Sequence, residues 1–167
     1  MTETFSLAAA LLLHEAGHLG AARLCGIPLR SCELRLTGAA LTFDFSRSGY
    51  GREALVHLGG PLSGIASAAS ALLFFGGRAA TFAGLSAVLS LVNLLPVEGL
   101  DGGGVLLCLL NRFLPPDAAW RIGKTLSALG ILALWTAVLW MELRVRANLS
   151  LLLFMLGAML HGFPMKE

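Results

Sequence analysis

Two histidines and a glutamate stand together in an otherwise apolar stretch near the start of the chain. His14, Glu15 and His18 lie within Leu11–Leu19, which reads LLLHEAGHL. Residues four apart on an α-helix lie on one face about one turn apart, so His14 and His18 can bind a single metal ion. Glu15 projects beside them and is placed to act as the base that activates water at the metal. The spacing therefore predicts a metal site with hydrolytic chemistry.

The composition indicates that these polar side chains are surrounded by lipid. Of the 167 residues, 56% are hydrophobic and 13% are charged, and the mean hydropathy is +0.78. Soluble chains are usually ~25% charged. An ionisable side chain near the centre of a membrane span costs roughly 2.5–3.5 kcal/mol, and a bound Zn²⁺ with neutral imidazole ligands would offset that cost. The alternative is that the histidines only form hydrogen bonds inside a helix bundle.

The apolar runs predict an all-α polytopic membrane protein with about five transmembrane helices and a short β-hairpin after the first. Gly104–Leu114 is too short to span a bilayer, and together with the preceding Leu-Asp-Gly it is expected to form a broken or re-entrant segment. Alternating apolar and polar residues over Leu29–Phe45 predict the hairpin. The transmembrane helices are expected at about Phe5–Cys25, Glu53–Phe75, Ala79–Leu95, Ile122–Met141 and Leu149–Phe163.

The basic residues predict an orientation for these five spans. If the first helix enters from outside, nine of the twelve Lys and Arg residues fall on the cytoplasmic side, against Arg78, Arg144 and Arg146 outside. The positive-inside rule favours this choice. We therefore expect a multi-pass integral protein of the bacterial cell membrane, with the lipid bilayer as a partner and the active site toward the cytoplasm. The net charge of +2 is too small and scattered to indicate nucleic-acid binding.

A catalytic zinc ion usually has three protein ligands and an open position for water, so a third ligand is expected elsewhere in the chain. Asp101 is favoured because it follows Pro96 and Gly99 in a break rich in glycine and proline, Asn93–Gly103. Backbone that is disrupted at membrane depth is tolerated only where it is buried in protein or lines a polar cavity. Glu98 is a weaker candidate for the same role. His57 and His161 are interpreted instead as core or interfacial histidines.

Three motifs in this order resemble the site-2 protease family (peptidase family M50) of intramembrane zinc metalloproteases. They are HEAGH in the first expected span, GGP in the second, and NLLPVEGLDGG after the third. The N-x-x-P-x-x-x-L-D-G pattern is most similar to the branch of the sporulation protease, stage IV sporulation protein FB. The resemblance implies that His14, His18 and Asp101 bind zinc and that Glu15 activates the water. It also implies that Asn93 and Pro96 line the active site near the substrate.

The same resemblance implies an activity, the hydrolysis of peptide bonds in or near the transmembrane segments of membrane-associated proteins. A pro-sigma factor or a membrane-tethered transcription factor is the kind of substrate implied, with membrane proteins as regulators. The chain departs from the sporulation branch in two ways, because no span is expected before the HExxH helix and no CBS domain after the last. Residues 1–167 are therefore expected to form a single membrane-embedded metalloprotease domain without a CBS or PDZ domain.

Two other functions are open at this stage. A catalytically inactive pseudoprotease that binds or shields partners would share the architecture, but the intact Glu15 argues against it. A small metal transporter or sensor would need repeated polar sites across the bilayer, and the sequence has one such cluster. The hairpin at Leu29–Phe45 either packs on the membrane surface or offers an edge on which an extended substrate segment pairs as an added strand.

Overall fold

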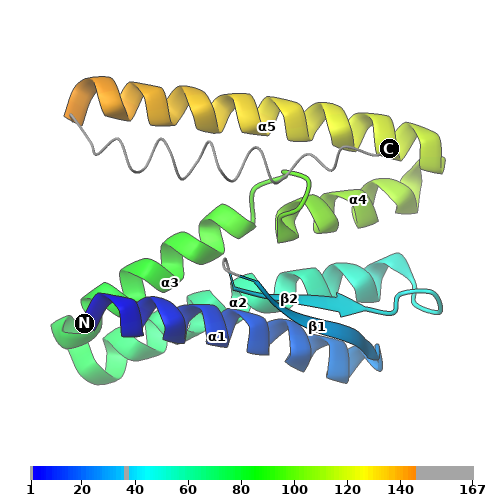
Figure 1. The fold of residues 1–167 in the computed structure, drawn as a ribbon. Helices are drawn as coiled ribbons and strands as arrows, with labels where there is room; N and C mark the ends of the chain where they lie inside the picture. The colour runs from blue at the N-terminus through cyan, green and yellow to red at the C-terminus, as the bar shows by residue number, and fades with distance from the viewer. Residues whose placement is uncertain (1, 36–37, 146–167) are drawn as a thin grey trace.

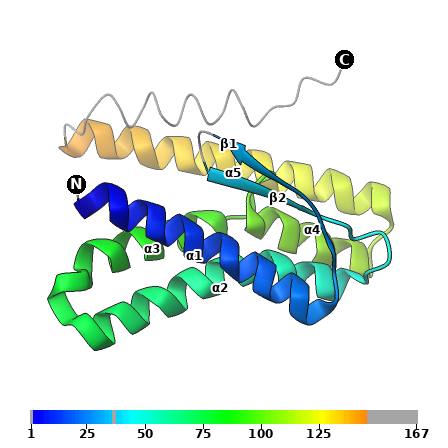
Figure 2. The ribbon, with the colours of Figure 1, turned by 60° about the horizontal axis from the view of Figure 1, so that its bottom comes forward.

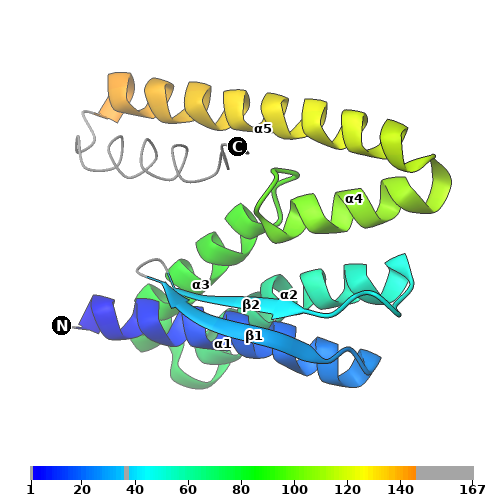
Figure 3. The same ribbon diagram turned by 45° about the vertical axis from the view of Figure 1, so that its right-hand side comes forward.

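The computed structural model describes residues 2–35 and 38–145 (Figure 1). Helix α2 is central, because it packs against α1, α3 and α4, while α4 in turn packs against α5. Figures 1 and 3 show α1 and the hairpin on one side of the molecule and α4 and α5 on the other. The elements in chain order are α1 (Thr2–Cys25), β1 (Leu29–Arg35), β2 (Gly38–Phe43), α2 (Tyr50–Phe75), the 3-10 helix η1 (Gly76–Ala79), α3 (Ala80–Asn93), α4 (Asp101–Phe113) and α5 (Pro116–Val145).

Glycine and proline end the helices that carry the polar residues. Gly26 follows α1 with a positive φ of 69°, a conformation that an L side chain rarely adopts, and its N–H donates to the carbonyl of Arg23. After α3, Pro96 and Gly99, the latter with φ 90°, keep the chain non-helical. Helix α4 then begins at Asp101, so this carboxylate lies in a first turn, where the helix dipole favours negative charge.

The hairpin expected after the first helix is present as an antiparallel pair. Cys32 lies opposite Leu41, and the register is irregular between Leu29 and Ser31. One further backbone bond, from the N–H of Asp44 to the carbonyl of Pro28 at 3.0 Å, continues the pairing past the end of β2. The hairpin therefore begins close to the end of α1 and leads directly into the loop before α2.

The expectation of about five transmembrane helices is wrong. Within residues 2–35 and 38–145, one helical stretch, Tyr50–Asn93, is long and apolar enough to cross a membrane. It contains α2, η1 and α3, so the second and third expected spans belong to this one stretch. Helix α3 has 14 residues and α4 has 13, too few for a span of ~20. The 24 residues of α1 include His14, Glu15 and His18, which make it less apolar.

The two remaining expected spans add no second candidate. Ile122–Met141 lies within α5. In the described part of the chain, Tyr50–Asn93 is a candidate membrane span and α5 is not. Leu149–Phe163 lies outside the described residues. The count of basic residues on each side assumed five spans, so that count does not by itself determine an orientation.

Small side chains fill the interior, and large apolar side chains face outward. Leu24 is 90% exposed, and Leu73 and Phe74 are 80% and 76% exposed. Packing through small residues is typical of helices that associate in a membrane, and broad exposed apolar surfaces mark contacts with lipid or with other proteins. The buried hydrophobic residues are mostly alanines: Ala10, Ala22, Ala68, Ala83 and Ala119, with Ile27, Val56, Val97 and Cys108.

Helices α1 and α2 lie side by side (Figure 2), and their backbones approach closely at two glycines. A Cβ on Gly59 would lie 2.6 Å from the carbonyl oxygen of Gly17, and a Cβ on Gly17 would lie 2.5 Å from the Cβ of Ser63. Ser63 Oγ donates to the carbonyl of Leu13 at 2.8 Å, one turn before Gly17. These contacts fix the distance between the histidines of α1 and the backbone of α2.

Substitution of Gly17 by alanine is expected to destabilise the protein by about 1–3 kcal/mol, because the added methyl group forces the two backbones apart. Gly20→Ala on the same helix is the matched control, since a Cβ at Gly20 meets nothing within 4 Å. The control is expected to keep or slightly raise the stability, because alanine favours helix. Thermal unfolding in detergent, followed by circular dichroism, measures the difference. Equal melting temperatures for the two variants would contradict the close crossing.

Candidate metal centre

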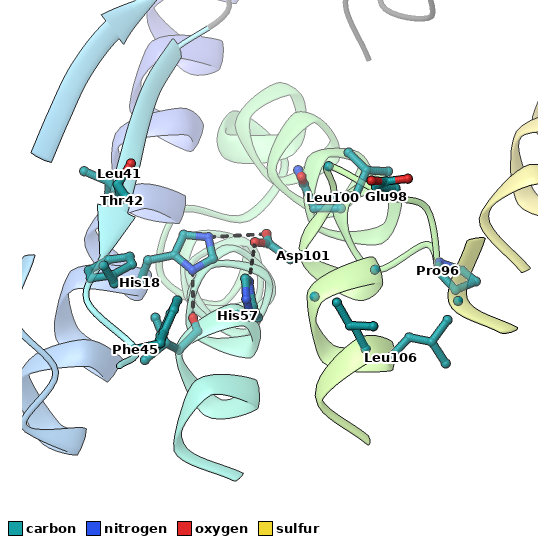
Figure 4. Close-up of a pocket in the computed structure, with 18 of the residues that line it drawn as sticks. His18, Leu41, Thr42, Phe45, His57, Pro96, Glu98, Leu100, Asp101 and Leu106 are labelled. Atoms are coloured by element: carbon teal, nitrogen blue, oxygen red, sulfur yellow. Dashed lines mark hydrogen bonds and ion pairs between the residues drawn. The ribbon is translucent and has the colours of Figure 1, made fainter. Parts of the chain in front are cut away.

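Two helices bring three potential metal ligands together. His14 and His18 come from α1, and Asp101 comes from the first turn of α4. The Nε2 atom of His14 lies 3.1 Å from Oδ2 of Asp101, and the Nε2 atom of His18 lies 3.2 Å from Nε2 of His14 and 3.3 Å from the same oxygen. Figure 4 shows His18 and Asp101 pointing toward each other. The three atoms form a nearly equilateral triangle between two buried imidazole rings and a half-buried carboxylate.

This triangle has the dimensions of one face of a tetrahedral zinc site. Zinc binds imidazole nitrogen and carboxylate oxygen at about 2.0–2.2 Å, which puts neighbouring ligand atoms of a tetrahedron about 3.3–3.6 Å apart. The observed separations of 3.1, 3.2 and 3.3 Å are slightly shorter. Three protein ligands leave the fourth corner for water or substrate, which is the arrangement of catalytic zinc. The residues therefore fit a zinc ion.

The hydrogen bonding of His18 also suits a ligand. Its Nδ1–H donates to the carbonyl oxygen of Val56 at 2.8 Å, and because a carbonyl only accepts, the proton is on Nδ1. In the neutral ring, Nε2 then carries a lone pair directed at the Asp101 carboxylate, and the contact becomes attractive when either a proton or a metal cation lies between the two atoms. Metal-binding histidines usually donate their other N–H to a carbonyl or carboxylate in this way. His14 differs, because its buried Nδ1 has no partner among the described residues.

Helix α2 leaves space for both imidazole rings at Gly60. A Cβ at this position would lie 2.7 Å from Nε2 of His14 and closer still to Nε2 of His18. Pro61, the next residue, is fully buried inside the same helix. The GGP sequence of α2 therefore shapes the wall behind the two histidines, although it contributes no ligand atom.

His57, which the sequence indicated to be a core or interfacial histidine, lies beside the cluster. Its Nδ1 is 3.8 Å from Oδ1 of Asp101 (Figure 4), whereas the other two histidines contact Oδ2. Its ring lies 5.8 Å from that of Phe45, and a Cβ on Gly104 would touch it at 2.6 Å. One signal was available, because His57 precedes Gly60 by three positions and so shares its face of α2.

A cavity of about 710 Å³ opens beside the three ligands. Glu15, Asn93 and Pro96 line it, as do residues of β2, α2, α4 and α5. The side-chain amide of Asn93 donates to the carbonyl of Leu89 at 2.9 Å, which fixes its direction. Glu15, Asn93 and Pro96, for which the sequence implies catalytic or substrate-binding roles, thus line the same cavity.

The other sequence candidates for the third ligand are placed differently. Glu98 lines the cavity but is exposed, and it does not belong to the ligand group found among the described residues. Its backbone N–H donates to Ser127 Oγ at 2.7 Å, which attaches the loop before α4 to helix α5. His161 lies outside the described residues. Among these candidates, Asp101 is the residue whose carboxylate meets the two histidines of α1.

Two carboxyl groups of the site have shifted pKa values. Burial raises the pKa of Asp101, but hydrogen bonds with His14, His18 and His57 outweigh it and hold this pKa well below its ordinary value. Asp101 therefore stays ionised, the form in which a carboxylate binds a metal ion. For Glu15, burial outweighs the attraction of the histidines and raises the pKa. That shift moves the Glu15 carboxylate toward the range where a group exchanges protons efficiently near neutral pH.

Comparison with known proteins adds no relative. No protein-family model matches the sequence, and no curated protein matches it significantly. The functional interpretation depends on the geometry of this site and on the sequence motifs.

Asp101→Asn is expected to lower the affinity for zinc at least about tenfold, because an amide replaces the one anionic ligand. Glu98→Gln is the matched control, since it makes the same change of charge in the same cavity and is expected to keep the metal. Zinc bound after dialysis against a chelator, measured by mass spectrometry of the metal, compares the two variants. Equal retention of zinc by Asp101→Asn and the wild type would show that the third ligand is a residue other than Asp101.

Proposed function

We propose that this chain is a zinc-dependent intramembrane metalloprotease that hydrolyses peptide bonds of membrane-associated proteins. The proposal is carried by the triangle of nitrogen and oxygen atoms of His14, His18 and Asp101, 3.1–3.3 Å apart, with Glu15 lining the adjoining cavity. The resemblance of HEAGH and NLLPVEGLDGG to the site-2 protease family supports the same activity. Three ligands and one free carboxylate form the minimal set for hydrolysis at zinc.

The residues divide the work of the reaction between them. Zinc held by His14, His18 and Asp101 would polarise the scissile carbonyl and bring the pKa of water toward ~7. Glu15 takes a proton from the water as the water oxygen bonds to the carbonyl carbon. Glu15 then returns this proton to the leaving nitrogen as the C–N bond breaks. One water is consumed, and a carboxyl group and an amine are formed.

The walls of the cavity suit an extended polypeptide. Leu41, Thr42 and Phe43 of β2 line it on the side of the hairpin, and its volume of about 710 Å³ lies in the usual range of ligand pockets. We propose that a substrate segment unwinds and lies along β2, where main-chain hydrogen bonds hold it as an added strand. An extended backbone exposes its carbonyl groups, whereas a helix keeps them in internal hydrogen bonds.

We also propose that the protein is held in a bacterial cell membrane through Tyr50–Asn93, with the cavity toward the cytoplasm. The exposed leucine and phenylalanine side chains of α1 and α2 support contact with lipid. Four arginines support the orientation, because they lie near the end of α1, the start of α2, the end of α4 and the start of α5, which gather at one end of the molecule (Figures 1 and 3). Basic residues favour the cytoplasmic side. They are Arg23, Arg52, Arg112 and Arg121.

Glu15→Gln is expected to reduce proteolysis at least about 100-fold, because the variant lacks the proton acceptor but keeps the three ligands. The assay co-expresses the chain with a candidate membrane-tethered transcription factor or pro-sigma factor and follows cleavage by immunoblot. Glu3→Gln, an exposed glutamate on the same helix, is the matched control and is expected to cleave like the wild type. Cleavage that is equally fast with Glu15→Gln would contradict the proposed protease.

A further inference from the structure

Helix α5 turns one face toward the cavity, and the catalytic proposal assigns no role to that face. Trp120, Gly123 and Lys124 line the cavity, and Ser127 accepts the hydrogen bond from the Glu98 backbone. These positions recur at intervals of three and four residues, so they share one side of the helix. The hydrogen bond to the loop before α4 fixes this side against the cavity. Lys124 is therefore a wall residue of the cavity.

The ammonium group of Lys124 is held in place by its neighbour. Its Nζ lies 4.6 Å from the centre of the Trp120 ring, a cation–π contact between residues four apart on α5. Within the part of the chain that the structure describes, no carboxylate forms an ion pair with Lys124, and it is the one Lys or Arg that lines this cavity. The cavity therefore contains a positioned positive charge without an anionic partner.

The other charged groups of the cavity make this lysine distinctive. Asp101 is engaged by three histidines, and Glu15 and Glu98 are both acidic. A carboxylate that entered the cavity would be repelled near the two glutamates and attracted at the wall formed by α5. A partly enclosed site strengthens such attraction, because its apolar walls focus the field of a fixed charge.

We propose that Lys124, supported by Trp120, binds a carboxylate of the substrate chain close to the scissile bond. The carboxylate belongs either to an acidic side chain or to a free carboxyl terminus, since both present the same two oxygens to an ammonium group. The inference rests on the proposed protease activity, because it names the feature by which that activity selects its substrate. Trp120 supplies a flat apolar surface on which the neighbouring substrate residue packs.

Matched peptides test the proposal in cleavage. The zinc-loaded full chain in detergent is incubated with internally quenched fluorescent peptides of leucine and alanine. Each peptide carries one Glu, Gln or Lys at one of several successive positions, and its C-terminus is either free or amidated. At one position, the wild type is expected to cleave the Glu peptide with a kcat/KM about three- to tenfold above that of the Gln peptide. If the free terminus is the group recognised, the same preference appears instead between the acid and amide forms. Lys124→Glu is expected to reverse the preference in favour of Lys.

Arg121→Glu is the matched control, because it makes the same charge change on α5 at an exposed position that does not line the cavity. It is expected to keep the wild-type preference. If Lys124→Glu and Arg121→Glu discriminate the peptides equally, Lys124 does not bind the substrate. Weaker association of Lys124→Glu with phosphatidylglycerol vesicles, with unchanged peptide discrimination, would assign the lysine to lipid phosphate and overturn the proposal.

A binding measurement separates this inference from the proposed function. Fluorescence anisotropy of labelled Glu and Gln peptides is measured with the Glu15→Gln chain, which is expected to bind without cleaving. Tighter binding of the Glu peptide, lost in the double variant Glu15→Gln/Lys124→Glu, supports the carboxylate site. If the wild type then cleaves no peptide, that result counts against the protease activity but not against the carboxylate site. Equal affinity for the Glu and Gln peptides at every position, and for acid and amide ends, would overturn the carboxylate site.

Discussion

The backbone contact between Gly17 and Gly59 is the constraint on which the rest of the site depends. Because α1 and α2 touch there, His18 reaches the carbonyl of Val56 and both imidazole rings fit over Gly60. Helix α4 also packs on α2 and brings Asp101 from the other side. Helix α2 thus determines the spacing of all three ligand atoms without contributing one. Larger side chains at Gly59 or Gly60 would push the three ligand side chains apart, so that they could no longer bind one metal ion.

The chemistry of the site follows from its burial. Two imidazoles and a carboxylate are costly to place among apolar helices unless they satisfy one another or bind an ion. Here they converge within 3.1–3.3 Å, while the carbonyl of Val56 and the side chain of His57 engage their outer atoms. The same burial keeps Asp101 ionised through its histidine neighbours and raises the pKa of Glu15. In the proposed function, one carboxylate of the cavity is thus a metal ligand and the other a proton acceptor.

The break before Asp101 favoured this residue over Glu98 as the third ligand, and the resemblance to the site-2 protease family implied the same residue. The spacing of His14 and His18 predicted that their side chains meet, because helical periodicity acts locally. The hairpin was predictable for the same reason. The number of membrane spans was not, since apolar runs do not reveal that α2 and α3 belong to one stretch or that α4 is short. The positions of His57 and Lys124 depend on how α4 and α5 pack, and no local pattern in the sequence specifies that packing.

The most direct test of this account is X-ray absorption spectroscopy at the zinc edge of the purified full chain. We expect one zinc ion with nitrogen and oxygen neighbours at about 2.0–2.1 Å, outer-shell scattering from two imidazole rings, and no sulfur at about 2.3 Å. The chain contains three cysteines, so a sulfur ligand is a real alternative. A zinc–sulfur distance, or an all-oxygen shell without imidazole scattering, would contradict the assignment of His14, His18 and Asp101.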